Sequence, residues 1–471
     1  MGFVWLKISN YDIFCLLCAI IRIFFNNFAQ TFKRLLFQLM KKILFAFLMV
    51  VNMTMVFAQS GTNSPYSQYG LGLLADQASG FNRGMNGLGI GFRDHNQVNY
   101  LNPASYSSLD SITFIFDVGA SGQLTNFEEN GRKKNVKNAD FDFVVAGLRL
   151  APHLGMSFGI IPFTNIGYSY SHTGYVSDMR TASFVNNYNG SGGIHEVYLG
   201  LGWEPFKNFS IGVNGGYLWG SYTKSVVNNY SDASANTLSK TYSADVRNYK
   251  LDFGLQYTAN VSNTDKLTLG LAYTLGHKIG GKATCQVIMK NSQTNVSDTT
   301  LYPKNGGLDF EMPHMFGVGL GYNHANKLKV GVDYSYQQWS KVSYPVYTTV
   351  NNTPSYTLMK DQFSDRHKLT LGGEFCPNPA GKSFVKSIRY RAGVSYATPY
   401  LKINGADGPK EISASFGFGI PIVNIHNNRS LLNISAQWVR QDAKNLITEN
   451  TFRINIGLTF NQKWFDKWKI E

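Results

Sequence analysis

Very few residues of this 471-residue chain have the types and spacing that catalysis requires. Residues 155–159, Gly-Met-Ser-Phe-Gly, match the G-x-S-x-G nucleophile elbow of hydrolases, which needs a sharp turn between a strand and a helix. Here the motif lies inside a run of alternating apolar residues, which favours a strand interior. The nine histidines are scattered, and residues 59–471 contain neither H-E-x-x-H nor C-x-x-C. We therefore expect that the protein is not an enzyme and that it has no catalytic residue and no metal site.

Two glycine-containing stretches partly match phosphate-binding motifs. Residues 87–91, Gly-Leu-Gly-Ile-Gly, lack the G-x-G-x-x-G spacing and a following helical pattern. Residues 381–383, Gly-Lys-Ser, match the end of a P-loop, but Cys376 stands where the first glycine belongs. The net charge of +14 is spread along the chain without a long Lys/Arg run. These patterns indicate no cofactor and no nucleic-acid partner.

The composition indicates strands as the elements that position these residues. Only 15% of the residues are charged, well below the usual quarter, and 14% are aromatic. No long apolar run follows residue 58, so membrane helices are not expected there. A membrane protein of this composition is expected to cross the bilayer with alternating β-strands.

Residues 40–58 have the parts of a secretory signal peptide. Lys41 and Lys42 form the charged start, residues 43–51 the apolar centre, and Ala58 the cleavage site. We expect residues 1–39 to be an upstream mis-start or an extension.

From Ser111 onward, segments of about ten residues alternate apolar with small or polar side chains, as residues 452–460 show most clearly. This pattern is typical of strands that face lipid on one side and a lumen on the other. A soluble sandwich also alternates, so the connections must decide. About fourteen strands are expected, near 112–121, 139–151, 153–164, 194–204, 207–219, 247–259, 265–275, 314–323, 327–338, 366–376, 386–397, 410–421, 430–440 and 451–461.

The connections between these strands alternate between short and long. The short ones centre on Pro152, 205–207, 261–263, 323–325, 377–379 and 425–427, and the long ones cover 165–193, 220–246, 276–313 and 340–365. Short periplasmic turns and long outer loops are typical of a bacterial outer-membrane barrel. The pattern predicts an all-β, antiparallel transmembrane barrel over 111–465, with both termini in the periplasm of a Gram-negative cell.

Residues 59–110 precede the first strand and are placed to form a hatch inside the lumen. Glycines there allow tight packing and positive φ, and the residue before Pro103 favours an extended backbone. We expect these residues to hold the shape of the hatch. The motif consists of Gly84, Asn86, Gly87, Gly89, Asn102, Pro103 and Ala104.

With this motif the chain resembles the FadL-type family (OMPP/FadL/TodX-like) of outer-membrane transporters. The third predicted strand ends Ile-Pro-Phe-Thr-Asn over 161–165, where that family has a Pro-Phe-Gly-like step. The resemblance implies passive uptake of long-chain fatty acids or other hydrophobic compounds by a barrel with a hatch. Ligand would leave sideways through a wall opening beside a third-strand kink at Pro162 and Phe163.

A different function remains open for the same fold. PorV-like relatives are non-transporting interaction barrels of type IX secretion, so a shuttle or assembly component is the alternative. An apolar lumen pocket would favour transport, a broad polar mouth an interaction role, and an open polar channel a porin. Expected partners are outer-membrane lipids, a hydrophobic ligand and the barrel assembly machinery, with the protein itself a monomer.

Overall fold

The computed structural model describes residues 61–111, 113–176, 182–232, 234–379, 384–422 and 430–463. The expected signal peptide, the segment before it and the turn at 425–427 lie outside these residues, as do residues 381–383. Among the described residues, no helix has the length and apolar content needed to cross a membrane.

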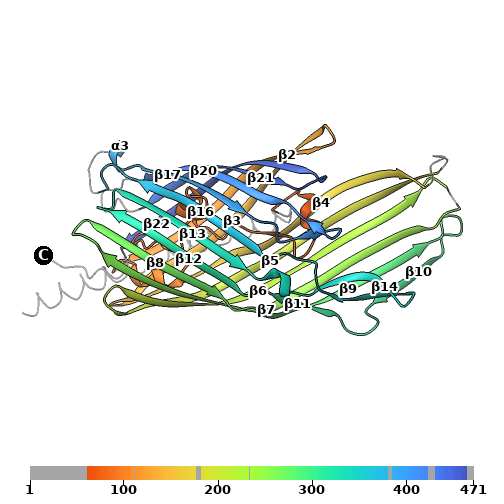
Figure 1. Ribbon diagram of the computed structural model, residues 1–471, viewed down its shortest axis with the longest axis horizontal. Coiled ribbons are helices and arrows are strands. Elements are labelled where there is room, and N and C mark those ends of the chain that lie inside the picture. The colour runs from red at the N-terminus through yellow and green to blue at the C-terminus, as the bar shows by residue number, and fades with distance from the viewer. Residues whose placement is uncertain are drawn as a thin grey trace, which may run out of the picture. The chain divides into compact units, whose positions relative to one another are not determined.

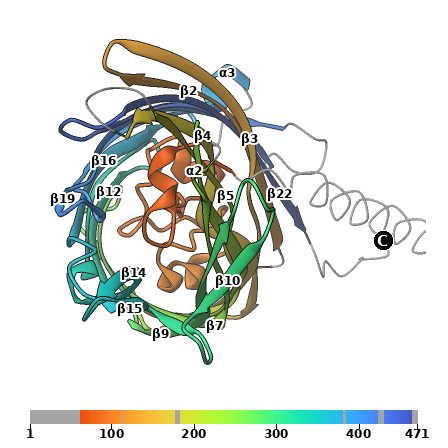
Figure 2. The same ribbon diagram turned by 90° about the vertical axis from the view of Figure 1, so that its right-hand side faces the viewer.

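Fourteen antiparallel strands form a closed ring in chain order (Figures 1 and 2). Each expected strand is present, and pairing of the first with the last closes the ring, from Thr113 opposite Lys463 to Glu128 opposite Thr448. The strands are β2 (Thr113–Glu129), β3 (Arg132–Ala151), β4 (Leu154–Tyr175), β5 (Ser183–Phe206), β6 (Phe209–Tyr230), β7 (Thr237–Asn260), β8 (Asp265–Thr274), β12 (Met315–His324), β13 (Leu328–Gln337), β16 (Arg366–Phe375), β17 (Arg389–Ala397), β20 (Lys410–Pro421), β21 (Leu431–Asp442) and β22 (Thr448–Lys463).

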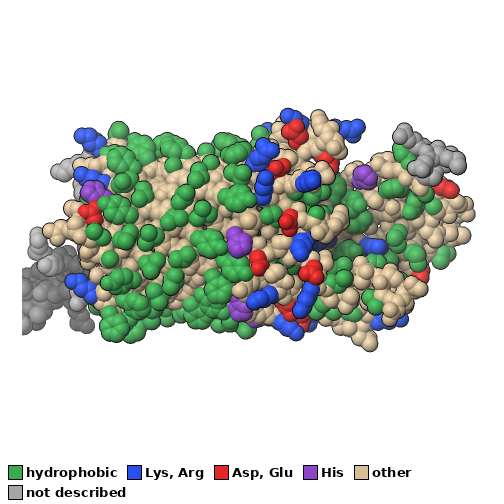
Figure 3. Space-filling model, viewed as in Figure 1, with side chains coloured by type: hydrophobic (Ala, Val, Ile, Leu, Met, Phe, Trp, Pro, Cys, Tyr) green, Lys and Arg blue, Asp and Glu red, His purple; other side chains and the backbone are tan. Residues whose placement is uncertain are grey.

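Alternation sorts the side chains of each strand between two faces. On β8, Leu269 and Leu271 are exposed on the outside, whereas Thr268 is buried against the interior. Figure 3 shows the outer apolar side chains gathered in a broad band, bounded at one side by a belt of charged residues. This band is the membrane-spanning part of the barrel, and the fold is that of an outer-membrane protein.

Beyond the charged belt, one side of the ring projects much further than the other (Figure 1). The predicted loops 165–193 and 220–246 are wrong over most of their length, because β4 to β7 continue as paired strands there. Tyr, Ser, Thr and Asn made these segments look like loops. Tyrosine and threonine also fit a pleated sheet, and Tyr170 stacks on Tyr188 across the ladder.

The other two predicted loops contain short elements of their own. Within 276–313, β9 (His277–Lys290) extends the sheet by pairing with β7. The remaining elements beyond the ring are β10 (Ser297–Tyr302), β11 (Leu308–Met312), η3 (Trp339–Lys341), β14 (Tyr344–Val350), β15 (Thr353–Met359), α3 (Phe384–Ser387), β18 (Lys402–Ile403) and β19 (Ala406–Asp407).

Residues 61–111, called the hatch below, lie inside the ring (Figure 2). The hatch contains four short elements and long stretches of turn, and most of its side chains are buried. These elements are η1 (Pro65–Gln68), β1 (Leu73–Leu74), α2 (Gly80–Arg83) and η2 (Pro103–Ser108).

Candidate functional site: the hatch, its seat and the β3–β4 seam

Asn102 joins the hatch to two strands of the wall. Its Oδ1 accepts a hydrogen bond from the Ala104 N–H and so caps η2, which begins at Pro103. Its Nδ2 lies 3.0 Å from the Ile90 carbonyl oxygen and 3.2 Å from those of Leu255 on β7 and Leu271 on β8. One amide therefore fixes both the internal fold of the hatch and its position against the wall.

Asn86 makes a second attachment on the opposite side of the lumen. It has a positive φ of 60°, as does Gly87 with 84°, so the two residues form a tight turn. The Asn86 Nδ2 donates to the hydroxyls of Ser395 on β17 and Ser413 on β20, each at 2.8 Å. Its Oδ1 accepts from Gln437 on β21 at 3.0 Å.

Asp333 on β13 makes the third attachment, and the sequence patterns did not single it out as a site residue. Its carboxylate accepts hydrogen bonds from the backbone N–H groups of Gly89 at 2.6 Å, Ile90 at 2.8 Å and Gly91 at 3.4 Å. Three consecutive N–H groups turned toward one carboxylate form an anion-binding nest. In the sequence, only its lumen-facing place in the alternation of residues 327–338 could have pointed to it.

Glycines on the wall let the hatch backbone approach the strands directly. At eight lumen-facing glycines, an added Cβ would come closer than 3.0 Å to backbone atoms of the hatch, a distance that real Cβ atoms do not show. We call this set the glycine belt: Gly155, Gly202, Gly212, Gly254, Gly270, Gly319, Gly321 and Gly393. It covers β4 to β8, β12 and β17, so the hatch is seated on about half the ring.

The space left between hatch and wall is divided into small cavities. Three of them have volumes of about 120 Å³, 220 Å³ and 290 Å³. The linings of the first two include Asp76, Arg83, Asp140, Asp142, Arg366, Lys368, Glu411 and Arg453. Apolar residues such as Leu101, Phe163 and Met315 also line the second cavity, so the space is mixed in character and smaller than the apolar lumen pocket that would favour transport. A larger apolar groove of about 1150 Å³ lies on the outer face of the wall, within the apolar band.

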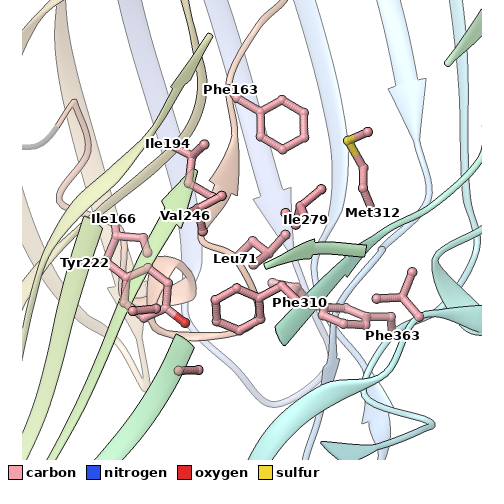
Figure 4. Packing of buried hydrophobic residues seen from close by; sticks show 14 of the residues in the cluster. Leu71, Phe163, Ile166, Ile194, Tyr222, Val246, Ile279, Phe310, Met312 and Phe363 are labelled. Carbon is pink, nitrogen blue, oxygen red and sulfur yellow. The ribbon is translucent and has the colours of Figure 1, made fainter. Parts of the chain in front are cut away.

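An aromatic cluster closes the lumen toward the projecting end. Figure 4 shows side chains of the hatch, the wall and the inserted elements turned toward one another, with Leu71 of the hatch between Val246 and Phe310. Trp339 and Phe363 complete this end, and their rings lie 5.4 Å apart. The side chains of the cluster fill the space between them.

The wall itself is split beside β4. The β3–β4 ladder ends at Val144 opposite Ile160, and a register shift follows between Pro162 and Thr164 on the β5 side. Phe163 sits in this bulge with its side chain only 5% exposed and packed into the aromatic cluster. The two residues of the expected kink therefore lie where the β3–β4 pairing stops.

Hatch residues take the place of β3 along this part of β4. Gln77 Nε2 donates to the Pro162 carbonyl oxygen at 2.7 Å, and the Ala75 N–H donates to that of Phe163 at 3.0 Å. The hatch strand β1 pairs with Thr164 and Asn165. Ser67 Oγ then bonds both the N–H and the carbonyl of Gly167, at 3.1 and 3.2 Å. A hatch segment acting as a strand thus seals the split.

The motif that resembled a nucleophile elbow is part of this wall. Ser157 lies in mid-strand on β4, and its Oγ contacts the Ala146 carbonyl and the Tyr198 hydroxyl, each at 2.9 Å. No strand-to-helix turn is present there. Among the described residues, no group of His, Cys, Asp or Glu is placed to hold a metal ion.

A closed fourteen-stranded ring with its lumen filled by an N-terminal hatch defines an outer-membrane barrel of the FadL-type fold. The family model described as BamG matches residues 39–471, so the chain belongs to the BamG family. No curated protein matches the chain.

Solved structures of the FadL type share the fold. A FadL homologue of Pseudomonas aeruginosa aligns with a TM-score of 0.57 and 12% identity, over 82% of this chain and 99% of its own. The toluene transporter TbuX of Ralstonia pickettii gives 0.56 and 13%, over 82% and 98%. The toluene transporter TodX of Pseudomonas putida gives 0.55 and 14%, over 83% and 99%.

Proposed function

We propose that this protein is a sealed, non-transporting barrel that acts as an interaction component of the barrel assembly machinery. The observation that carries the proposal is the seat of the hatch on the glycine belt, with small cavities of mixed polar and apolar lining beside it. Moving an alkyl chain from apolar to polar surroundings costs about 0.8 kcal/mol of free energy for each CH₂. Ligand pockets of known proteins are mostly apolar and larger, about 300–1,000 Å³.

The name of the family supports this assignment, since BamG points to the barrel assembly machinery. In our proposal the short turns and both termini lie in the periplasm. The projecting strands β4 to β7 then stand on the outer surface, where they offer a large area to a partner protein.

Affinity purification from solubilised outer membranes tests this function. We expect components of the barrel assembly machinery to co-purify at a constant ratio, and depletion of the protein to slow the appearance of heat-modifiable, folded reporter barrels. Recovery of type IX secretion proteins instead would replace the machinery as partner. Normal reporter assembly after depletion, with no co-purified machinery, would contradict the proposal.

The wall split at Phe163 favours a second candidate, which is uptake of hydrophobic compounds such as fatty acids. A ligand could leave the wall there if β1 of the hatch moved away from Thr164 and Asn165. Cells that express the protein would then take up labelled oleate or toluene faster than cells without it. Lipid extraction of the purified protein, followed by mass spectrometry, would also recover a bound hydrophobic ligand.

A further inference from the structure

Among the residues that the structure describes, one edge of β4 in the projecting sheet has no strand partner. From Tyr168 to Gly174 the described strand pairs only with β5, because β3 separates at Ile160 and hatch contacts to the β4 backbone end at Gly167. The β2–β3 hairpin diverges from β4 in two perpendicular views (Figures 1 and 2). With respect to the described part of the chain, the β4 edge can therefore accept an incoming strand.

Comparison with two neighbouring edges shows that this edge lacks the usual protection. Proteins protect exposed edges with charges, prolines or short strands. The facing edge of β3 carries Arg132, Lys133, Lys134 and Lys137, and β10 is six residues long with Asp298 within it and Pro303 after it. Residues 168–174 of β4 read Tyr-Ser-Tyr-Ser-His-Thr-Gly, without proline or an acidic, lysine or arginine side chain.

The direction of the backbone groups follows from the hatch contacts. The N–H and carbonyl of Gly167 both face the open side, where they bond Ser67. In an antiparallel strand these groups alternate sides from one residue to the next. Ser169, Ser171 and Thr173 therefore present their N–H and carbonyl groups to the open edge, and all three residues are exposed.

The hatch already uses this edge as a pairing surface. Leu73 and Leu74 pair with Asn165 and Thr164, and the open stretch continues directly from that contact toward the projecting end. An external strand would extend an existing ladder instead of creating a new one. Main-chain hydrogen bonds of this kind supply the affinity in β-augmentation, and alternate side chains supply the specificity.

We propose that the open β4 edge, residues 168–174, binds an extended, uncharged segment of a partner protein as an added antiparallel or parallel strand. The inference rests on the proposed interaction function and names the surface that serves it. The open stretch itself carries no acidic, lysine or arginine side chain. An uncharged segment therefore fits this site better than an acidic or basic one.

Site-specific photo-crosslinking in living cells tests the proposal. A benzophenone amino acid at Ser169 places the probe on the open edge, and the same amino acid at Lys134 serves as the control on β3. We expect the Ser169 probe to crosslink one protein reproducibly, and mass spectrometry to place the crosslink in a run of at least six uncharged residues. The Lys134 probe should not give that crosslinked peptide.

Proline substitutions separate edge pairing from simple proximity. In the Ser171→Pro/Thr173→Pro variant, two N–H donors of the open edge are lost, whereas the β4–β5 ladder keeps its own. We expect the crosslink to fall at least tenfold. The matched Ser171→Ala/Thr173→Ala variant keeps both N–H groups and should stay within twofold of the parent. If the proline variant no longer shows the heat-dependent gel mobility of a folded barrel, the Ser171→Lys variant is used in its place. A lysine on an edge strand protects it against pairing.

Each outcome of these experiments either supports or overturns the inference. A crosslink that prolines abolish and alanines preserve, within an uncharged partner segment, supports the inference. A crosslink only to a second copy of this chain, only to lipid, or to no molecule overturns it, as does a yield that prolines leave unchanged. If assembly-machinery components still co-purify in those cases, the proposed function stands and only the β4 edge is excluded as its surface.

Discussion

Asp333 shows how a single side chain can hold a segment that has little regular structure. Its carboxylate is buried and accepts from the N–H groups of Gly89, Ile90 and Gly91. Removing it would leave three buried donors without an acceptor, and each such donor costs about 1–3 kcal/mol.

We therefore expect Asp333→Ala to lower the free energy of unfolding by about 3 kcal/mol or more, which is at the upper end for a point substitution. Urea unfolding in detergent micelles, followed by tryptophan fluorescence, measures this change. The exposed Asp309 on β11 is the control, and Asp309→Ala should change the value by less than about 0.5 kcal/mol. Equal effects of the two substitutions would show that Asp333 does not anchor the hatch.

Lys224 gives a prediction for pH. It lies in the projecting part of β6, where its Nζ donates to the Gly70 carbonyl at 2.7 Å and sits 4.7 Å from the Tyr222 ring centre. Burial lowers the pKa of Lys224 from 10.5 to about 7. Between these values the unfolded chain binds more protons than the folded protein, so the free energy of unfolding rises with pH.

The contribution of Lys224 is expected to grow by about 1.4 kcal/mol per pH unit between pH 7 and 10 and to level off below pH 7, where both states are protonated. Subtracting the unfolding free energies of the Lys224→Met variant from those of the parent isolates this term. A difference that stays constant from pH 7 to 10 would contradict it.

For single residues, the sequence could indicate which of them shape the hatch but not which wall residues they contact. The Asn-Pro-Ala step and the glycines were recognisable from their backbone preferences. Ser395, Ser413 and Gln437, which bond Asn86, come from strands more than 300 residues away in the sequence. Only the closed ring brings them to that turn.

Among the elements, the wall strands carry two kinds of glycine that look alike in the sequence. Gly270 on β8 faces the hatch, and an added Cβ there would overlap the Ile90 carbonyl. Gly215 on β6 faces lipid, and the nearest atom to an added Cβ is 3.9 Å away. Both lie in alternating strands of similar composition.

Gly270→Val is expected to displace the hatch locally and destabilise the protein by about 2 kcal/mol or more, as overpacking does. Gly215→Val should have little effect, since a lipid-facing position has room for the side chain. Limited proteolysis measures the displacement of the hatch in each variant, and the midpoint of urea unfolding measures the change in stability. Equal resistance of the two variants to proteolysis would argue against the tight seat.

Alternation predicted the number and order of the strands because the membrane imposes it on each of them. It did not predict their length beyond the membrane. There the two faces of β4 to β7 no longer differ in contact with lipid, so tyrosine, serine and asparagine occur on both. The short hatch elements have no periodicity at all, and their place in the lumen was expected from their position ahead of the first strand and from the family resemblance.

For the whole molecule, the hatch is the barrier between the two ends of the lumen. Removal of residues 61–111 would expose an interior lined by polar and charged side chains such as Asp117, Glu196, Lys250 and Arg391. We expect the intact protein to be silent in planar bilayers and the deletion variant to conduct ions steadily. Steady conductance by the intact protein would show an open path past the hatch.

The glycine belt also sets an order of events during biogenesis. The ring closes when β22, the last strand in the chain, pairs with β2, the first of the ring. By then the hatch must already rest against β4 to β8, because a completed ring offers no way to lay a backbone flat on its inner glycines. The segment made first thus serves as the internal template around which later strands are laid, and the final pairing locks it in place.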